Sequence, residues 1–254
     1  MKNVVYTSLV GTSDHLLQPL FIREDYDYIC FSNDFEETSI GVWKIRKIPY
    51  DEKDDRRLSR YAKVLPHRVL QEYDYSIWMD ANLQIITDVF YKAVDAKVHQ
   101  NCLVAQVPHP LHDCIYDDIR SAYLGGRVKL KPSVRQYHHL KEEGFPKHEG
   151  LYENNLILRK HNDPSVIKIS ELWWKEYEAY TNRDQFSLSY VYWKYQFKPD
   201  YLLGNNKNAR NVDCIKYHKH TLRGSWLRRN PILRFFARNT RIAIRYVLMK
   251  IYFD

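Results

Sequence analysis

Residues 73–82 constrain the fold more than any other part of the chain, because they form an apolar segment that ends in an acid and an amide. Residues 76–79 suit the interior of a pleated sheet, and charge appears only where the predicted strand stops. Asp80 and Asn82 should therefore project side by side at a carboxyl edge. In an open α/β sheet that edge is where ligands bind.

Strands and helices alternate along the rest of the chain. We predict strands at 4–10, 26–32, 42–48, 102–107, 151–159 and from residue 213, and helices at 54–70, 113–123, 164–180 and 183–195. This alternation predicts an α/β fold with a mainly parallel mixed sheet flanked by helices. The polar segment 127–150 has no clear pattern and is interpreted as a flexible lid. Glycine-rich dinucleotide and P-loop motifs are absent from the sequence, which disfavours those chemistries.

The predicted helix at 54–70 has two faces of opposite character. Its apolar residues recur at steps of four, three and four: Leu58, Ala62, Leu65 and Val69. Its basic residues recur with the same steps, displaced by two positions: Arg56, Arg60, Lys63 and His67. Two positions correspond to about 200° around a helix, so the basic stripe should lie opposite the buried face. Pro66 should kink or restart the helix.

The positive charge of the chain belongs to its tail. Ten Lys or Arg and one acid lie between Cys214 and the end, a charge of +9 against +8 for the whole chain, so residues 1–213 carry −1. We divide the chain into a catalytic domain at 1–222 and a basic amphipathic helix at 223–254, where basic residues occupy one face and apolar residues another. The basic positions are Arg234, Arg238, Arg241 and Arg245, and the apolar positions are Phe235, Ile242, Tyr246 and Met249. Such a helix predicts binding to an anionic membrane surface. An intramolecular docking helix is the alternative, and nucleic acid is not expected as a partner because no recognition module accompanies the tail.

The four cysteines are widely spaced, so neither a disulfide framework nor a zinc site is predicted. The first ten residues are too short and too polar for a signal peptide, and no apolar run reaches the ~20 residues of a membrane span. We therefore expect a cytoplasmic protein that attaches peripherally to the inner face of the membrane.

Asp80 and Asn82 are candidate metal ligands, because hard divalent cations bind oxygen atoms of this kind. The alternative is a capped strand end, with Asp80 hydrogen-bonded to a neighbouring turn. His218 and His220 follow the predicted late strand, and one of them could complete a metal shell.

Five blocks of sequence, in order, resemble one family: residues 6–11, 55–67, 75–82, 150–155 and 183–185. It is the glycosyltransferase-like family that includes plant proteins of seed mucilage synthesis and turgor control, and bacterial proteins of surface-polysaccharide loci. The resemblance covers residues 3–200 and leaves out the tail. It implies the GT-A type of nucleotide-diphospho-sugar transferase fold and a metal-linked acid at Asp80, with manganese or magnesium as the cation. The usual second acid is replaced here by Asn82.

A nucleotide-sugar donor gives the basic stripe a role, because the leaving nucleoside diphosphate gains negative charge as the glycosidic bond breaks. Arg60 and Lys63 would stabilise that charge, with Arg56 at the margin. The alternative is a solvated helix face. Tyr6, Thr7 and Asp34 are expected near the nucleoside.

Sugar hydroxyls would be bound by carboxylates and amides farther along the chain. The candidates are Glu153, Asn154, Asn155, Arg183, Asp184 and Gln185, together with His112 and its neighbours His109 and Asp113. If the reaction inverts configuration, Asp184 is the first choice for the general base and Glu153 the second. The alternative for Asp184 is an acid placed at a helix N-terminus by the macrodipole.

The sequence thus predicts a glycosyltransferase that moves a sugar from a nucleoside diphosphate, expected to be UDP, to a saccharide or lipid-linked saccharide in surface polysaccharide synthesis of the capsule or lipopolysaccharide type. Two rivals stay open. A nucleotidyl or phosphoryl transferase would use the same acid and basic groups but cleave at phosphorus. A carbohydrate or membrane adaptor would have kept the fold without turnover.

Overall fold

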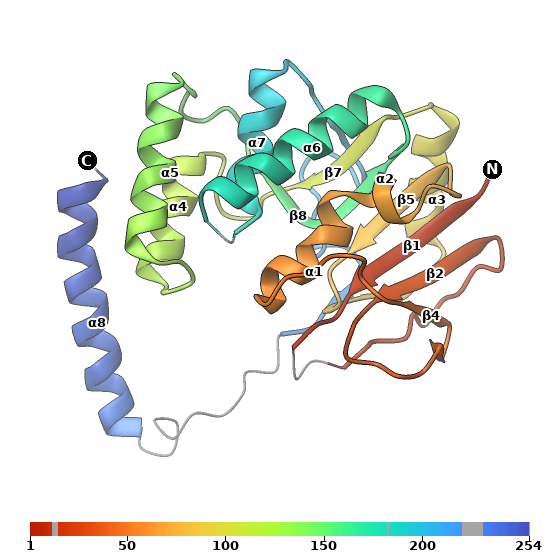
Figure 1. Ribbon diagram of the computed structural model, residues 1–254, viewed down its shortest axis with the longest axis horizontal. Helices are drawn as coiled ribbons and strands as arrows, with labels where there is room; N and C mark the ends of the chain where they lie inside the picture. Colours follow the sequence, from red (N-terminus) through yellow and green to blue (C-terminus); the bar gives the residue numbers. More distant parts are fainter. Residues whose placement is uncertain (12–14, 182, 220–230, 254) are drawn as a thin grey trace.

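A mixed eight-stranded sheet forms the centre of the molecule (Figure 1). In spatial order its strands are β3 (Ser39–Ile40), β4 (Trp43–Arg46), β2 (Tyr26–Phe31), β1 (Asn3–Ser8), β5 (Tyr75–Met79), β8 (Tyr152–Arg159), β7 (Val104–Pro108) and β9 (Asp200–Tyr201). Strand β1 pairs in parallel with β2 and β5, whereas β8 runs antiparallel between β5 and β7. The predicted α/β class and the mainly parallel mixed sheet are confirmed.

The structure is a computed structural model that describes residues 1–11, 15–181, 183–219 and 231–253, with the backbone alone at 231–238. Its helices are α1 (Asp55–Val64), α2 (Pro66–Val69), α3 (Val89–His99), α4 (Ile115–Leu124), α5 (Leu130–Glu142), α6 (Pro164–Ala179), α7 (Gln185–Lys194) and α8 (Pro231–Tyr252). Strands β6 (Leu83–Ile85) and β10 (Ile215–Tyr217) form a separate antiparallel pair. Of these elements, α3, α5 and β6 were not predicted from the sequence.

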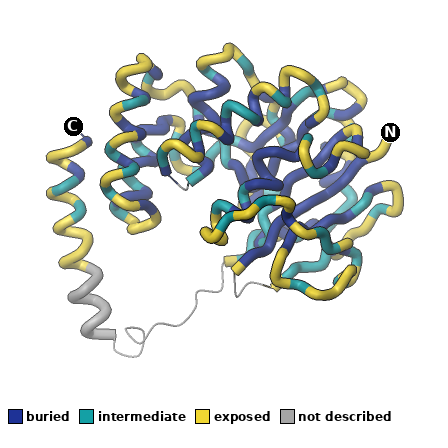
Figure 2. Tube along the Cα trace, in the orientation of Figure 1, coloured by how far each residue is buried: buried dark blue, intermediate teal, exposed yellow. Residues whose placement is uncertain are grey.

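Alternate residues of the central strands enter two cores. Val4 and Tyr6 of β1 join the core under α1, α6 and α7, whereas Val5 joins the core under α3. This period of two places buried side chains on both faces of the sheet, and Figure 2 shows the buried strands at the centre of the fold. The carboxyl ends of β1 and β5 remain at the sheet edge, where Asp80 follows β5.

The predicted helix at 54–70 is two helices. Asp54 caps α1 by accepting a hydrogen bond from the Arg57 backbone N–H at 2.9 Å, and Pro66 begins α2 as the sequence predicted. The apolar face is buried as expected. The basic stripe is not fully opposite the buried face as predicted, because Lys63 is buried too, which disfavours the alternative of a solvated helix face.

The structure contradicts the prediction of a flexible lid at 127–150. Thirteen of these residues form α5, whose buried positions are Ser133, Gln136, Tyr137 and Leu140. Their spacing of three, one and three is that of one helical face. The signal was hidden because two of the four buried side chains are polar.

The tail helix α8 packs against α4 through its last turns (Figure 1). Met249 and Phe253 are buried, and the Phe253 ring contacts Tyr123 and Tyr137 with centroid separations of 5.7 and 5.2 Å. The Arg120 guanidinium donates to the Phe253 carbonyl at 2.6 Å. The opposite side of α8 is exposed (Figure 2). Within the described part of the chain, no helix combines the length and hydropathy needed to cross a bilayer.

We predict that Phe253→Ala releases the end of α8, because the substitution empties an aromatic contact that anchors the helix. Trypsin cleavage after Arg241 and Arg245, followed by mass spectrometry, should become at least severalfold faster. Tyr252→Ala, at a side chain that is 44% exposed, is the matched control and should cleave at the wild-type rate. Equal rates for the two variants would show that this contact does not hold the helix.

Candidate active site

Asp80 lies where the sequence predicted, at the carboxyl end of β5. Its backbone N–H donates to the Asn155 carbonyl at 2.9 Å, which fixes it beside β8. Its Oδ1 accepts hydrogen bonds from the Trp78 indole N–H at 2.7 Å and from the Lys63 ammonium at 3.3 Å. The carboxylate remains 27% exposed and lines a small cavity with Thr7 at the end of β1. Asp80 therefore presents a fixed, partly accessible carboxylate at the ligand edge of the sheet.

Lys63 joins Asp80 to a second acid and so forms a chain of four charges. Its ammonium lies 2.6 Å from Oδ2 of Asp184, whose Oδ1 lies 3.3 Å from the Arg60 guanidinium. The Lys63 side chain is only 2% exposed, and its ammonium also lies 5.2 Å from the Trp78 ring. Buried charges persist only when they are paired, so each group of this charge chain depends on its neighbours. We call Arg60, Asp184, Lys63 and Asp80 the charge chain.

Burial and pairing act in opposite directions on Asp184. Burial alone would raise the pKa of this carboxyl, but Lys63 and Arg60 outweigh it and hold the pKa well below its ordinary value. Both carboxylate oxygens are close to a cation. A carboxylate with a lowered pKa accepts a proton poorly, and these contacts argue against the predicted role of Asp184 as general base. Asp184 instead positions the two cations.

The two amides expected to bind sugar at 154 and 185 are engaged within the protein. The Gln185 side chain donates to the Tyr152 carbonyl and accepts from the Asn154 backbone N–H. Oδ1 of Asn154 accepts from Gln106 at 3.1 Å. These bonds tie β8 to α7 and β7, so both residues link elements of the fold, and Nδ2 of Asn154 has no partner among the described residues; their role in sugar binding stays a prediction.

Neither the nitrogen nor the oxygen of the buried Asn155 side-chain amide has a hydrogen-bond partner among the described residues, whereas Asn154 lacks one only at Nδ2. Met79 pairs with Leu156, and Asn155 follows next to Asp80, from whose backbone N–H its carbonyl accepts a hydrogen bond. A buried amide without a partner costs free energy. This amide therefore marks a place where a bound ligand would supply the missing hydrogen bonds.

Glu153 and Arg210 form an ion pair at the same edge, with the Arg210 guanidinium 4.4 Å from the centroid of the Tyr217 ring. The Glu153 side chain is only 12% exposed. Glu153 is the second choice for a general base, and like Asp184 its carboxylate is paired with a cation, here Arg210.

Asn82 connects the two strands of the small sheet. Its Nδ2 donates to the His218 carbonyl at 2.9 Å, while the His218 ring bonds to Gln84 at 2.9 Å. Nε2 of His218 is therefore engaged by Gln84 and is not free to bind a metal. The other candidate, His220, lies outside the described residues. Oδ1 of Asn82 and the second oxygen of Asp80 are hard oxygen atoms of the kind that a divalent cation binds, and neither has a hydrogen bond among the described residues. The remaining ligands of the cation would have to be oxygen atoms of the bound nucleotide sugar and water molecules.

The residues expected near the nucleoside are in different environments. Tyr6 is fully buried and accepts a hydrogen bond from Arg159, so it contacts the core and its assignment to the nucleoside is wrong. Thr7 stays close to Asp80, and its hydroxyl has no partner among the described side chains and backbone groups. Asp34 is exposed and accepts from the Gly11 N–H at 2.6 Å. Arg56 lies two turns from Lys63 and lines a separate, larger cavity.

A second polar cluster was only partly anticipated. Asp118 is buried in the first turn of α4, with its carboxylate 3.4 Å from the Arg183 guanidinium and 3.9 Å from the His109 ring. Burial lowers the pKa of His109 to about 4, so its imidazole is neutral at neutral pH. His112 stacks on His109 at 5.5 Å. The sequence signal for Asp118 was an acid on the apolar face of a predicted helix.

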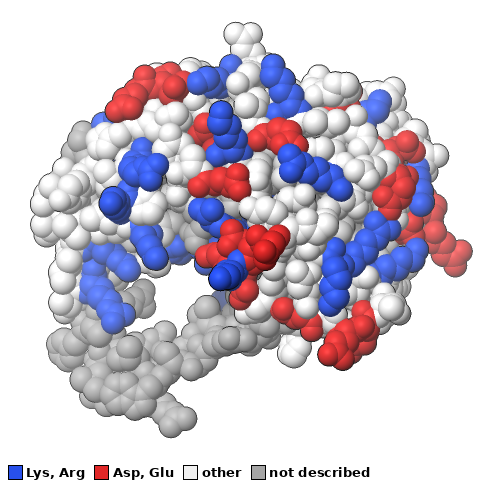
Figure 3. All heavy atoms as spheres, in the orientation of Figure 1, with Lys and Arg blue, Asp and Glu red and all other residues white. Residues whose placement is uncertain are grey.

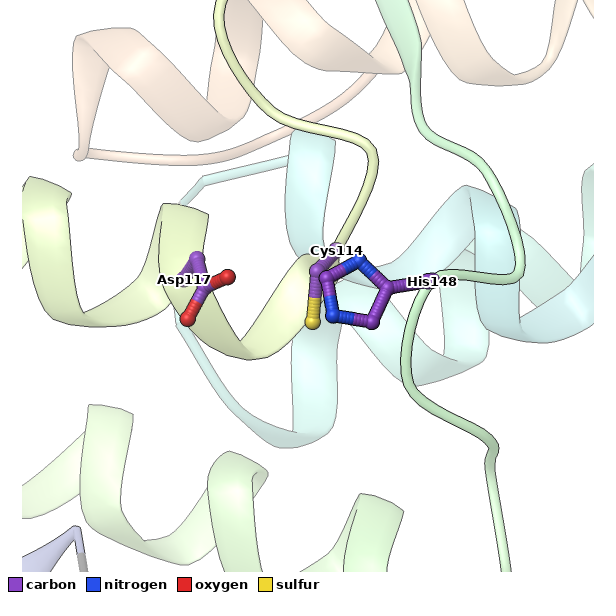
Figure 4. A group of neighbouring side chains, drawn as sticks. All are labelled: Cys114, Asp117 and His148. Carbon is purple, nitrogen blue, oxygen red and sulfur yellow. The ribbon is translucent and has the colours of Figure 1, made fainter.

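One group of three possible metal ligands occurs among the described residues, at Cys114, Asp117 and His148 (Figure 4). Figure 4 shows these side chains at the start of α4 and on a loop beside it. His148 is exposed and already lies 2.9 Å from Asp113. This group is composed of different elements from those that hold Asp80, so it does not replace the predicted site.

A mixed α/β sheet with a carboxylate and paired cations at its ligand edge is consistent with the glycosyltransferase-like class, and the comparison with protein families assigns the chain to it. The model of the family described as "TOD1/MUCI70, glycosyltransferase-like domain" matches residues 24–220. The chain belongs to this family, as its sequence blocks indicated.

Two curated relatives from Arabidopsis thaliana show how the family is named. A probable hexosyltransferase MUCI70 is 24% identical over 209 residues, covering 77% of this chain and 36% of the relative. The alkaline ceramidase TOD1 is 25% identical over 195 residues, covering 70% and 40%. The chain therefore spans well under half the length of these relatives.

Two solved structures are among those to which the chain is similar. The apo structure of the bifunctional glycosyltransferase WbbM has a TM-score of 0.44 at 12% identity, over 78% of this chain and 38% of that one. Mouse xyloside xylosyltransferase 1 in its apo form has a TM-score of 0.38 at 10% identity, over 75% and 79%.

We predict that Asp184→Asn lowers the free energy of unfolding by about 3–5 kcal/mol near neutral pH, because Lys63 and Arg60 then lack their shared anion. The native pKa of Asp184 is depressed, so its contribution is present above the ordinary value of 3.8 and is lost as the pH falls below it. The difference from wild type should therefore shrink in acid.

Urea titrations followed by tryptophan fluorescence at neutral and acidic pH measure both effects. Asp213→Asn changes an exposed carboxylate and should remain within about 0.5 kcal/mol of wild type. An Asp184→Asn variant as stable as this control at neutral pH would contradict the charge chain.

Proposed function

We propose that this chain is a glycosyltransferase that moves a sugar from a nucleoside diphosphate, in the first instance UDP, to a saccharide or lipid-linked saccharide. The observation that carries the proposal is the partly exposed Asp80 carboxylate, held at the carboxyl end of β5 by Lys63 and Trp78. Family membership supports it, because the family model is a glycosyltransferase-like domain and one relative is named a probable hexosyltransferase.

The charges of the site explain why a divalent cation is part of the proposal. The charge chain contains two cations and two carboxylates, so its formal charge is zero. A neutral cluster attracts a diphosphate weakly. A cation such as manganese or magnesium, held by Asp80 and Asn82, would make the edge positive and stabilise the leaving diphosphate.

The protein's own groups then have separate tasks. Trp78 and Lys63 hold the Asp80 carboxylate in place, and Asp184 fixes Lys63 and Arg60 before the donor arrives. Such preorganisation lowers the reorganisation needed as charge develops on the leaving group. The free amide of Asn155, next to Asp80, would bond a hydroxyl or phosphate oxygen of the donor.

The proposed setting is surface polysaccharide synthesis at the inner face of a membrane. Support comes from α8, where Ile244, Val247 and Ile251 are exposed on one side, at spacings of three and four residues. The described basic side chains of the helix include Arg241 and Lys250, both exposed. An exposed apolar stripe beside cations is typical of helices that lie in an anionic membrane interface.

We predict that UDP binds with manganese at least tenfold more tightly than without it, and that Asp80→Asn removes this gain because a neutral amide holds the cation poorly. Isothermal titration of the full chain measures both affinities. Asp200→Asn changes an acid on the far edge strand β9 and should retain the gain. A gain of equal size in wild type and Asp80→Asn would remove Asp80 from the site.

Product analysis separates the rival chemistries. With a UDP-sugar and an acceptor, release of UDP is expected, whereas pyrophosphate or UMP would indicate transfer at phosphorus. Because one relative is named an alkaline ceramidase, ceramide is included as a second substrate. Fatty acid release from ceramide without UDP release from any nucleotide sugar would contradict the proposal.

We predict that replacing Ile244, Val247 and Ile251 together by Ser reduces sedimentation with phosphatidylglycerol vesicles severalfold, because it removes the apolar stripe that would enter the interface. The control replaces Leu20, Val89 and Leu111, which are exposed elsewhere. Identical sedimentation of both triple variants would exclude α8 as the membrane contact.

A further inference from the structure

A large hollow lined by basic residues includes the start of α1, and the proposed function assigns no role to it. Its volume is about 1000 Å³, and it is lined by the start of α1, the segment that joins α4 to α5, the two residues that follow α6, and Arg245 of α8. Figure 3 shows Lys and Arg side chains around this hollow on the side of α4, α5 and α8. We call it the basic hollow.

The charge of the basic hollow is unbalanced. Its lining contains six basic residues against the two acids Asp54 and Asp55: Lys53, Arg56, Arg57, Arg127, Lys129 and Arg245. Asp54 is also committed to capping α1. Among the described residues, no carboxylate forms an ion pair with any of these six cations. Uncompensated cations around a concave surface raise the local concentration of anions.

Two of the six cations, Arg245 and Arg127, are held by contacts with the rest of the fold. Arg245 reaches in from α8, with Nη1 3.5 Å from the Leu124 carbonyl and its guanidinium 6.0 Å from the centroid of the Tyr123 ring. A Cβ at Gly126 would lie 2.2 Å from Arg245 Nη1, and Gly126 has a φ of +72° that glycine adopts most readily. Burial and the nearby charge of Arg183 lower the pKa of Arg127, as expected where cations crowd together.

The basic hollow connects to the charge chain along α1. Arg56 lines the hollow and Arg60 pairs with Asp184, and residues four apart lie on the same side of a helix. On the other wall, Thr181 lines the hollow three positions before Asp184. The hollow and the charge chain therefore lie on neighbouring turns of α1.

We propose that the basic hollow binds the phosphate or diphosphate of the acceptor, so that the acceptor is a phosphate-linked saccharide. This inference rests on the proposed function for the identity of the ligand as acceptor, whereas phosphate binding itself does not. Guanidinium groups match phosphate oxygens through paired hydrogen bonds, and the lining supplies four of them. Tyr123 and Tyr180 also line the hollow, and their rings pack against Phe253 and His139. Because α8 forms one wall, a phosphate carried on a lipid would enter from the membrane side.

The test uses the full chain and inorganic pyrophosphate as the probe, measured by titration calorimetry. Replacing both Arg127 and Lys129 by Gln should weaken pyrophosphate binding roughly tenfold or more, because each charge-assisted contact contributes strongly. The control replaces Lys131 and Lys175 by Gln, which removes two exposed charges outside the hollow and should leave binding unchanged. Equal weakening in both double variants, or no binding by wild type, would overturn the inference.

Two further arms separate the possible outcomes. Saturating UDP and manganese should leave pyrophosphate binding in place, whereas complete competition would show that the probe occupies the donor site and overturn the inference. Sedimentation with phosphatidylcholine vesicles containing a polyprenyl phosphate distinguishes a lipid source from a free phosphate ester: loss in the Arg127/Lys129 variant supports the lipid form. If pyrophosphate binds but no nucleotide sugar does, the proposed function fails while the phosphate site stands.

Discussion

The buried ammonium of Lys63 is the contact on which the rest of the site depends. It lies within 2.6 Å of Asp184 and 3.3 Å of Asp80, and so joins α1, the start of α7 and the end of β5. Because a buried charge is costly without partners, the three elements cannot separate without leaving an ion unpaired. The same contact orients the Asp80 carboxylate toward the ligand edge. Stability and the proposed chemistry therefore share one interaction.

The sequence predicted the fold class, the end of β5 and the break at Pro66, because these depend on local apolar patterns and on proline. It missed α5, whose buried face includes Ser133 and Gln136, since polar residues on a helix core interrupt the apolar period. It also missed α3, where the apolar and polar residues are weakly segregated.

Site residues were found by type but not always by role. The structure brings together four predicted residues: Asp80, Lys63, Arg60 and Asp184. The sequence could indicate them because the acids lie at the ends of elements and the bases lie on one face of a helix. The pairing of Asp184 with two cations could not be read from spacing, because it depends on how α1 and α7 pack. For the same reason Tyr6 was predicted to bind a nucleoside, although it is fully buried.

A crystal structure of the chain with UDP and manganese is the most direct test of the proposed site. The cation should lie on Asp80, with the diphosphate between it and the Arg60 side of α1 and with the Asn155 amide bonded to the ligand. A nucleotide bound away from the carboxyl ends of β1 and β5, with Asp80 still contacting only Trp78 and Lys63, would contradict the account.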